Sequence, residues 1–140
     1  MAVKEILLLL GVIVCWGVTP FLEKSALTRN LPLDGLYVRT LAVFILFTLY
    51  YAGSNRLARL TSIPGKDLFY FSLAGILAGF LGMIFYFLLL KANPVSKATP
   101  LTATYPLITA LIAFTVFGEQ PTWQRIAGTI LIVAGIMLVK

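Results

Sequence analysis

The sequence predicts an all-α membrane protein with five transmembrane helices. Of its 140 residues, 60% are hydrophobic and 11% are charged, an apolar share above that of soluble domains. The mean hydropathy is +0.98. The apolar residues fall into five runs, and a helix needs roughly 20 such residues to cross a hydrocarbon core about 30 Å thick. The five predicted helices are residues 6–22, 36–52, 68–90, 98–118 and 123–139.

The five runs differ in how well they suit a membrane span. Residues 68–90 and 98–118 are long and hold no charged residue, whereas residues 6–22 and 36–52 are shorter. Residues 123–139 are marginal, because an arginine lies near their start. The first run is similar to a signal peptide but has no small-x-small cleavage site, so we expect it to be retained as a helix.

No connection between the runs is long enough to form a soluble domain, so residues 1–140 are expected to be one membrane domain. The longest connection, residues 53–67, is a polar loop. An odd number of spans places the two termini on opposite sides of the bilayer. Lysines and arginines are then divided five against six between the two faces. This balance is compatible with insertion in either orientation, or with an orientation set by the first helix or by the insertion machinery.

The composition argues against several classes of function. There is no histidine, and the single cysteine, Cys15, lies inside the first apolar run, so no metal site, cofactor site or disulfide framework is expected. No nucleophile, base and metal ligand gather at any helix end, and we therefore expect no catalytic residues and no enzyme. The net charge of +6 is attributed to loops beside anionic lipid headgroups, not to nucleic-acid binding.

The fourth run carries a polar stripe at helical spacing. Thr102, Tyr105 and Thr109 follow one another at i, i+3 and i+7, and Pro106 lies within the stripe and must loosen the backbone hydrogen bonds. Two interpretations remain open. The threonine hydroxyls bond back to carbonyls of their own helix, or the stripe lines a substrate cavity.

A second group of residues that could carry function lies in the first two runs. Trp16, Thr19 and Glu23 share the same i, i+3, i+7 spacing on one helix. Arg39 lies one turn inside the second helix, where it either extends to the headgroups or turns inward, with Glu23 or Asp34 as its partner. Pro20 is expected to bend the first helix, which we predict to end near Glu23.

Glycines repeat along one face of two helices. Small residues at such spacing let another helix approach closely. We expect these positions to serve helix packing, and a place beside a cavity is the alternative. They are Gly75, Gly79 and Gly82 in the third helix, and Gly128 and Gly135 in the fifth.

Several of these residues together resemble the EamA-type drug/metabolite transporters over essentially the whole chain. The order and spacing of the motifs carry the resemblance more than any single one. They are Cys15-Trp16-Gly17 through Lys24, Arg39, Ala92-Asn93-Pro94, Tyr105-Pro106-Leu107, Phe117-Gly118-Glu119, Gly128 and Gly135. The related small multidrug resistance transporters carry an essential glutamate in their first helix, and Trp16 stands at that position here.

The resemblance implies a function. A typical member has two five-helix units in tandem around a central cavity, so this chain corresponds to one half of a ten-helix transporter. It implies a multi-pass protein of the cell (inner) membrane that moves a small organic metabolite by alternating access, as a homodimer that is antiparallel. The expected cavity residues are Trp16, Thr19, Arg39, Thr102, Tyr105 and Thr109. The alternatives are a non-transporting scaffold, or a subunit of a heteromeric transporter or lipid-linked-substrate flippase.

Overall fold

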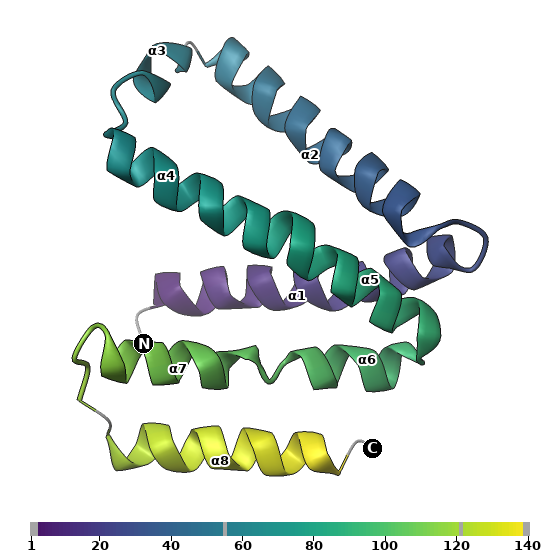
Figure 1. The fold of residues 1–140 in the computed structure, drawn as a ribbon, viewed down its shortest axis with the longest axis vertical. Coiled ribbons are helices and arrows are strands. Elements are labelled where there is room, and N and C mark those ends of the chain that lie inside the picture. Colours follow the sequence, from purple (N-terminus) through teal and green to yellow (C-terminus); the bar gives the residue numbers. More distant parts are fainter. Residues whose placement is uncertain (1–2, 55, 121, 139–140) are drawn as a thin grey trace. The chain divides into compact units, whose positions relative to one another are not determined.

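The computed structural model describes residues 3–54, 56–120 and 122–138, and these residues are helical with short connections and no strand (Figure 1). The chain divides into two compact units, residues 1–91 and 92–140, which are described separately. The helices of the first unit are α1 (Val3–Leu27), α2 (Pro32–Gly53), α3 (Leu57–Leu60), α4 (Gly65–Ala74), the π-helix η1 (Gly75–Leu81) and α5 (Gly82–Ala92). Those of the second unit are α6 (Val95–Thr102), α7 (Tyr105–Thr115) and α8 (Trp123–Met137).

Helix α1 is longer than the sequence predicted and passes through its proline. It continues to Leu27 rather than ending near Glu23, and Pro20 lies inside it. Proline removes one backbone donor from a helix. The donor missing at Pro20 would have bonded to the Trp16 carbonyl, and the neighbouring Thr19 hydroxyl donates to the Cys15 carbonyl at 2.7 Å. With 25 residues, α1 is long enough to cross a bilayer.

The third predicted span is one continuous helical rod of 28 residues, from Gly65 to Ala92, with a π-helical segment in its middle. In η1 the hydrogen bonds skip one more residue than in an α-helix, and the Gly82 N–H correspondingly donates to the Leu77 carbonyl. An added Cβ on Gly82 would lie 2.9 Å from that carbonyl oxygen. Glycine is thus required at the end of η1 because a side chain would collide with the backbone.

The buried core of the first unit lies where α1 ends, α2 begins and α5 ends. Leu27, Leu36, Phe87 and Leu90 are almost completely buried there. Gly35 borders this core, and an added Cβ there would make ordinary van der Waals contacts, 3.4 Å from the Phe87 ring and 3.8 Å from Leu27. Most other apolar side chains of the unit are exposed, as expected for helices that face lipid or another helix.

Two lysines form hydrogen bonds between the same helix ends. The Lys24 ammonium donates to the Leu90 carbonyl at 2.6 Å and to the Lys91 carbonyl at 3.1 Å. These carbonyls belong to the last turn of α5, where helices leave carbonyls without backbone partners and where positive charge is stabilising. The Lys91 ammonium in turn donates to the Asn30 carbonyl, at 2.9 Å, in the loop between α1 and α2.

In the second unit, the predicted continuous helix 98–118 is interrupted. Helix α6 ends at Thr102 and α7 begins at Tyr105, with a turn at residues 103 and 104. Pro106 explains the break, because it cannot donate to the Thr102 carbonyl and its ring would collide with that group. The Ala103 N–H is shared between the Thr99 and Pro100 carbonyls, and the Thr104 N–H bonds to the Leu101 carbonyl at the shorter i−3 spacing.

The connection from α7 to α8 is built by a glycine and a threonine cap. Gly118 has φ of +65°, a left-handed conformation in which glycine avoids the clash of a side chain. The Glu119 N–H then bonds back to the Ala113 carbonyl, which closes the end of α7. Thr122 caps α8, its hydroxyl accepting from the Arg125 N–H at 3.4 Å.

Four helical segments meet the length and hydropathy of a membrane span: 3–27, 32–53, 65–92 and 95–115. Helix α8 is apolar but has only 15 described residues, and residue 139 of its predicted range lies outside the described part of the chain. The all-helical membrane architecture is confirmed. That residues 1–140 form a single membrane domain stays a prediction.

We expect Leu90→Ala to destabilise the protein by about 2 kcal/mol, because it leaves a cavity in the packed junction of α1, α2 and α5. Leu88→Ala, two residues away on the same helix, is the matched control. Leu90 is 0% exposed and Leu88 is 52% exposed. Unfolding in mixed detergent micelles, followed by circular dichroism, measures both. Equal losses would contradict the assigned core.

Candidate functional site

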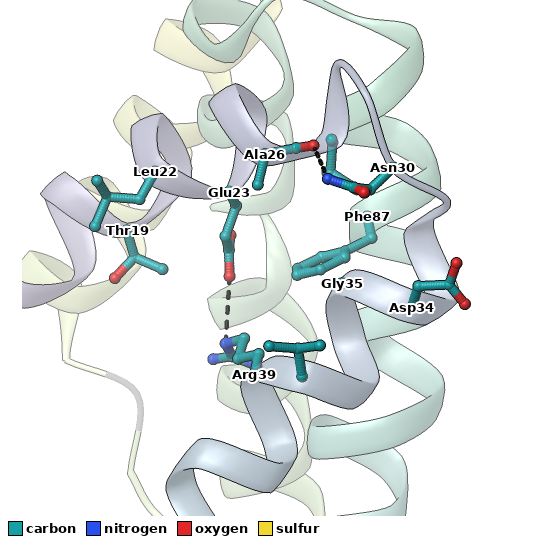
Figure 2. Close-up of a pocket in the computed structure, with 11 residues that line it drawn as sticks. Thr19, Leu22, Glu23, Ala26, Asn30, Asp34, Gly35, Arg39 and Phe87 are labelled. Atoms are coloured by element: carbon teal, nitrogen blue, oxygen red, sulfur yellow. Dashed lines mark hydrogen bonds and ion pairs between the residues drawn. The ribbon is translucent and has the colours of Figure 1, made fainter.

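The first unit contains a cavity of about 450 Å³ between the end of α1 and the start of α2 (Figure 2). This volume lies within the range of small-molecule sites. Its apolar wall comes mainly from Leu22, Leu27, Val38 and Phe87. The other lining residues are Thr19, Glu23, Ala26, Asn30, Asp34, Gly35 and Arg39.

An ion pair crosses this cavity from α1 to α2. The Arg39 Nε lies 3.3 Å from Glu23 Oε1 (Figure 2). The Glu23 side chain is 9% exposed and that of Arg39 is 42% exposed, so the carboxylate is the desolvated partner. Of the two acids considered as partners of Arg39, the structure selects Glu23. The Asp34 carboxylate points away from Arg39 (Figure 2).

The ion pair leaves Glu23 incompletely satisfied. Although Oε1 lies within ion-pair distance of Arg39, the geometry does not make a hydrogen bond, and Oε2 has no hydrogen-bond partner within the described residues. The two findings agree, because charge attraction depends on distance whereas a hydrogen bond also requires direction. A buried acceptor without a hydrogen-bond partner costs free energy. Glu23 Oε2 is such an acceptor, and Glu23 lines the cavity.

Two other polar side chains of the cavity donate to carbonyls of α1. The Thr19 hydroxyl donates to the Cys15 carbonyl, and the Asn30 amide donates to the Ala26 carbonyl at 2.9 Å (Figure 2). Their oxygens remain able to accept. The remaining donors among these side chains are the second N–H of the Asn30 amide and the outer nitrogens of the half-exposed Arg39.

The predicted cavity residues divide between the two units. Thr19 and Arg39 line the cavity, whereas Trp16 does not and is 66% exposed. Thr102, Tyr105 and Thr109 belong to the second unit, which is described separately, and their place in a cavity stays a prediction. The Thr102 hydroxyl donates to the Thr99 carbonyl at 2.8 Å, and the Thr109 hydroxyl to the Tyr105 carbonyl at 3.4 Å. The sequence left open whether these hydroxyls bond to carbonyls of their own helix or line a cavity, and these bonds are of the first kind.

The break before Tyr105 also removes the continuous helical face on which the polar stripe was predicted. Helical spacing relates Thr102 to Tyr105 only within an unbroken helix. The packing role of the glycines stays a prediction. An added Cβ at Gly75, Gly79, Gly128 or Gly135 would meet no described atom within 4 Å, so these faces are open in the single chain.

Sequence reasoning did not place Glu23, Asn30, Gly35 and Phe87 among the cavity residues. The i, i+4 spacing of Thr19 and Glu23 on α1 was the available signal for Glu23. Phe87 carried none, because it reaches the cavity from α5, a helix far along the chain from α1 and α2. In the described part of the chain, no group of three or more His, Cys, Asp or Glu side chains could hold a metal ion.

Long apolar helices with a partly polar cavity define a polytopic α-helical membrane protein of the transporter type. The chain belongs to the EamA-like transporter family, whose model matches residues 3–140. The resemblance noted in the sequence is thereby confirmed. No curated protein and no solved structure gives a significant match.

We expect Arg39→Met to destabilise the protein by about 1–3 kcal/mol, because it strands a buried carboxylate. The matched control is Arg125→Met, which removes a pair with Glu119 of similar length, 3.2 Å, whose partners are 60% and 52% exposed. That change is expected to cost about 0–1 kcal/mol. Detergent unfolding measures both variants, and an equal cost would show that the Glu23–Arg39 pair is no more than a surface interaction.

Proposed function

We propose that this chain is one half of a carrier for a small organic metabolite, and that a second, inverted copy completes the transport path. Substrate binds in the cavity between α1 and α2 and is released on the other side of the bilayer by alternating access. The cavity of about 450 Å³, with an ion pair set in an apolar wall, is the observation that carries the proposal.

Two features of the chain support an inverted partner. If α8 also crosses the membrane, as the sequence predicts, the number of membrane helices is odd. Two such units joined in tandem then have opposite orientations, and separate copies reproduce that arrangement only if they insert in both directions. The lysines and arginines, divided five against six, favour neither direction strongly. The open glycine faces of η1 and α8 are suitable surfaces for close helix contact with a second copy.

The η1 segment supports a conformational cycle. π-helical segments within α-helices occur frequently at functional sites, and here one lies in the middle of a long membrane rod bounded by Gly75 and Gly82. A rod with a π-helical middle can change its hydrogen-bond register without unfolding. This supplies a place for the helix to bend when access alternates between the two sides.

Filling the cavity should stop transport. Proteoliposomes containing the purified chain are loaded with a mixture of small amines, amino acids, sugars and carboxylic acids, and efflux is followed by mass spectrometry. Ala26→Phe places a ring in the cavity and should lower the efflux of the transported compound about tenfold or more. Ala42→Phe, on the exposed surface of α2 and outside the cavity, should retain most of it.

If the wild-type chain alone moves none of these compounds, the scaffold or heteromeric-subunit alternatives are favoured over the homodimeric carrier. Efflux that survives Ala26→Phe would place the transport path elsewhere in the molecule.

If the chain forms an inverted pair, each of its termini should be found on both sides of the membrane. Protease-sensitive tags at the N- and C-termini, read in intact and permeabilised cells, are expected to show each terminus in both locations. Adding two lysines to the 53–67 loop should shift the population toward one orientation and reduce transport, and co-expression with an oppositely biased variant should restore it. A single fixed orientation in the wild type would eliminate the inverted homodimer.

A further inference from the structure

We infer that the cavity binds the primary ammonium group of an amphipathic amine, with Glu23 as the anchoring residue. This inference rests on the proposed function, because it names the substrate class of the same cavity. The argument depends on which polar atoms of the cavity remain available to a ligand.

The first step concerns Glu23 Oε2. This oxygen is buried, has no hydrogen-bond partner within the described residues, and belongs to a side chain that is 9% exposed. Figure 2 shows the carboxylate directed from α1 toward α2, across the space that the cavity residues surround. A charged acceptor in this position gains most from a ligand that carries both a positive charge and an N–H donor.

The second step concerns the neighbouring groups. Thr19 lies one helical turn before Glu23, and its oxygen can accept a second hydrogen bond because its proton is held by the Cys15 carbonyl. One of the two Asn30 N–H donors is likewise held by the Ala26 carbonyl. Beside Glu23 Oε2, the atom of Thr19 that remains available is therefore an acceptor, and an ammonium group with three donors matches these two oxygens better than a carboxylate or a sugar.

The third step concerns the role of Arg39. Its side chain is 42% exposed, its Nε lies 3.3 Å from Glu23 Oε1, and it makes no hydrogen bond to Oε2. It balances the carboxylate in the empty cavity without occupying Oε2, so a ligand can bind without displacing it. The apolar part of the amine then lies against Leu22, Val38 and Phe87.

Hydrogen-bond donation, rather than charge alone, is the distinguishing requirement. A quaternary ammonium ion carries the same charge but has no N–H group, and it leaves Oε2 without a hydrogen bond. We expect the cavity to discriminate between these two kinds of cation, whereas a site that only attracts positive charge would not.

The test is a binding series in phosphatidylcholine nanodiscs, measured by isothermal titration calorimetry with protein-free nanodiscs subtracted. The probes share one apolar part: 2-phenylethylammonium, its N,N,N-trimethyl derivative, 2-phenylethanol and 3-phenylpropanoate. We expect the primary ammonium to bind about tenfold or more tightly than each of the others. Equal binding of the carboxylate or of the quaternary ion would overturn the inference.

Variants then assign the effect to Glu23. Glu23→Gln should reduce the affinity for 2-phenylethylammonium about tenfold or more, and Glu23→Asp should restore part of it. Asp67→Asn removes a carboxylate from the first turn of α4, outside the cavity, and should leave the affinity unchanged. Unchanged affinity in Glu23→Gln would overturn the inference. If that variant does not fold, the selectivity of the wild type among the four probes decides it.

The ammonium group has two possible sources, a free amine or the headgroup of phosphatidylethanolamine. Replacing half of the phosphatidylcholine by phosphatidylethanolamine should weaken binding of the probe several-fold if the lipid occupies the site, and should leave it unchanged if a free amine is the ligand. Either outcome supports the shared chemistry. Because binding is measured without transport, an amine that binds but is not moved contradicts only the proposed carrier function. Transport without amine preference contradicts only the present inference.

Discussion

The structure of the first unit depends on two consecutive residues of α1 that are directed to different helices. Glu23 meets Arg39 of α2 at 3.3 Å, and Lys24 donates to the last carbonyls of α5. Neighbouring residues of an α-helix point about 100° apart, so a single turn can hold two partners at once. The apolar junction of Leu27, Leu36, Phe87 and Leu90 forms around these contacts, and the cavity lies beside it.

In a lipid environment such polar contacts carry unusual weight. The hydrophobic effect does not drive helices together once they are inserted, because lipid tails are as apolar as leucine side chains. Close packing and polar bonds between helices must supply the specificity. Lys24 is an example, since its ammonium group donates to two carbonyls at the end of α5 and holds that end close to α1. The exposed apolar surface of the remaining helices is then available for lipid and for a partner.

Glu23 and Arg39 stabilise the unit through their ion pair and also line the cavity, and these two roles make opposite demands on the pair. A pair satisfied on every atom would hold α1 and α2 rigidly, whereas Glu23 keeps one oxygen without a partner. Functional sites commonly retain such unsatisfied groups, because the energy lost in the empty state is recovered when a ligand binds. The Glu119–Arg125 pair shows the contrast: both side chains are exposed, water can satisfy them, and nothing in their position calls for a ligand.

The sequence alone determined the all-helical membrane class and the approximate spans, because apolar runs and their lengths are local properties. It also narrowed the partner of Arg39 to Glu23 or Asp34. Tertiary structure decided between those two acids, brought Phe87 to the cavity and placed the Thr102 hydroxyl on its own helix. Pro106 predicted a loss of backbone hydrogen bonding in the helix, but only the structure showed that the helix breaks at residues 103 and 104. Helical periodicity states which residues share a face, and it contains no information about which other helix that face will meet.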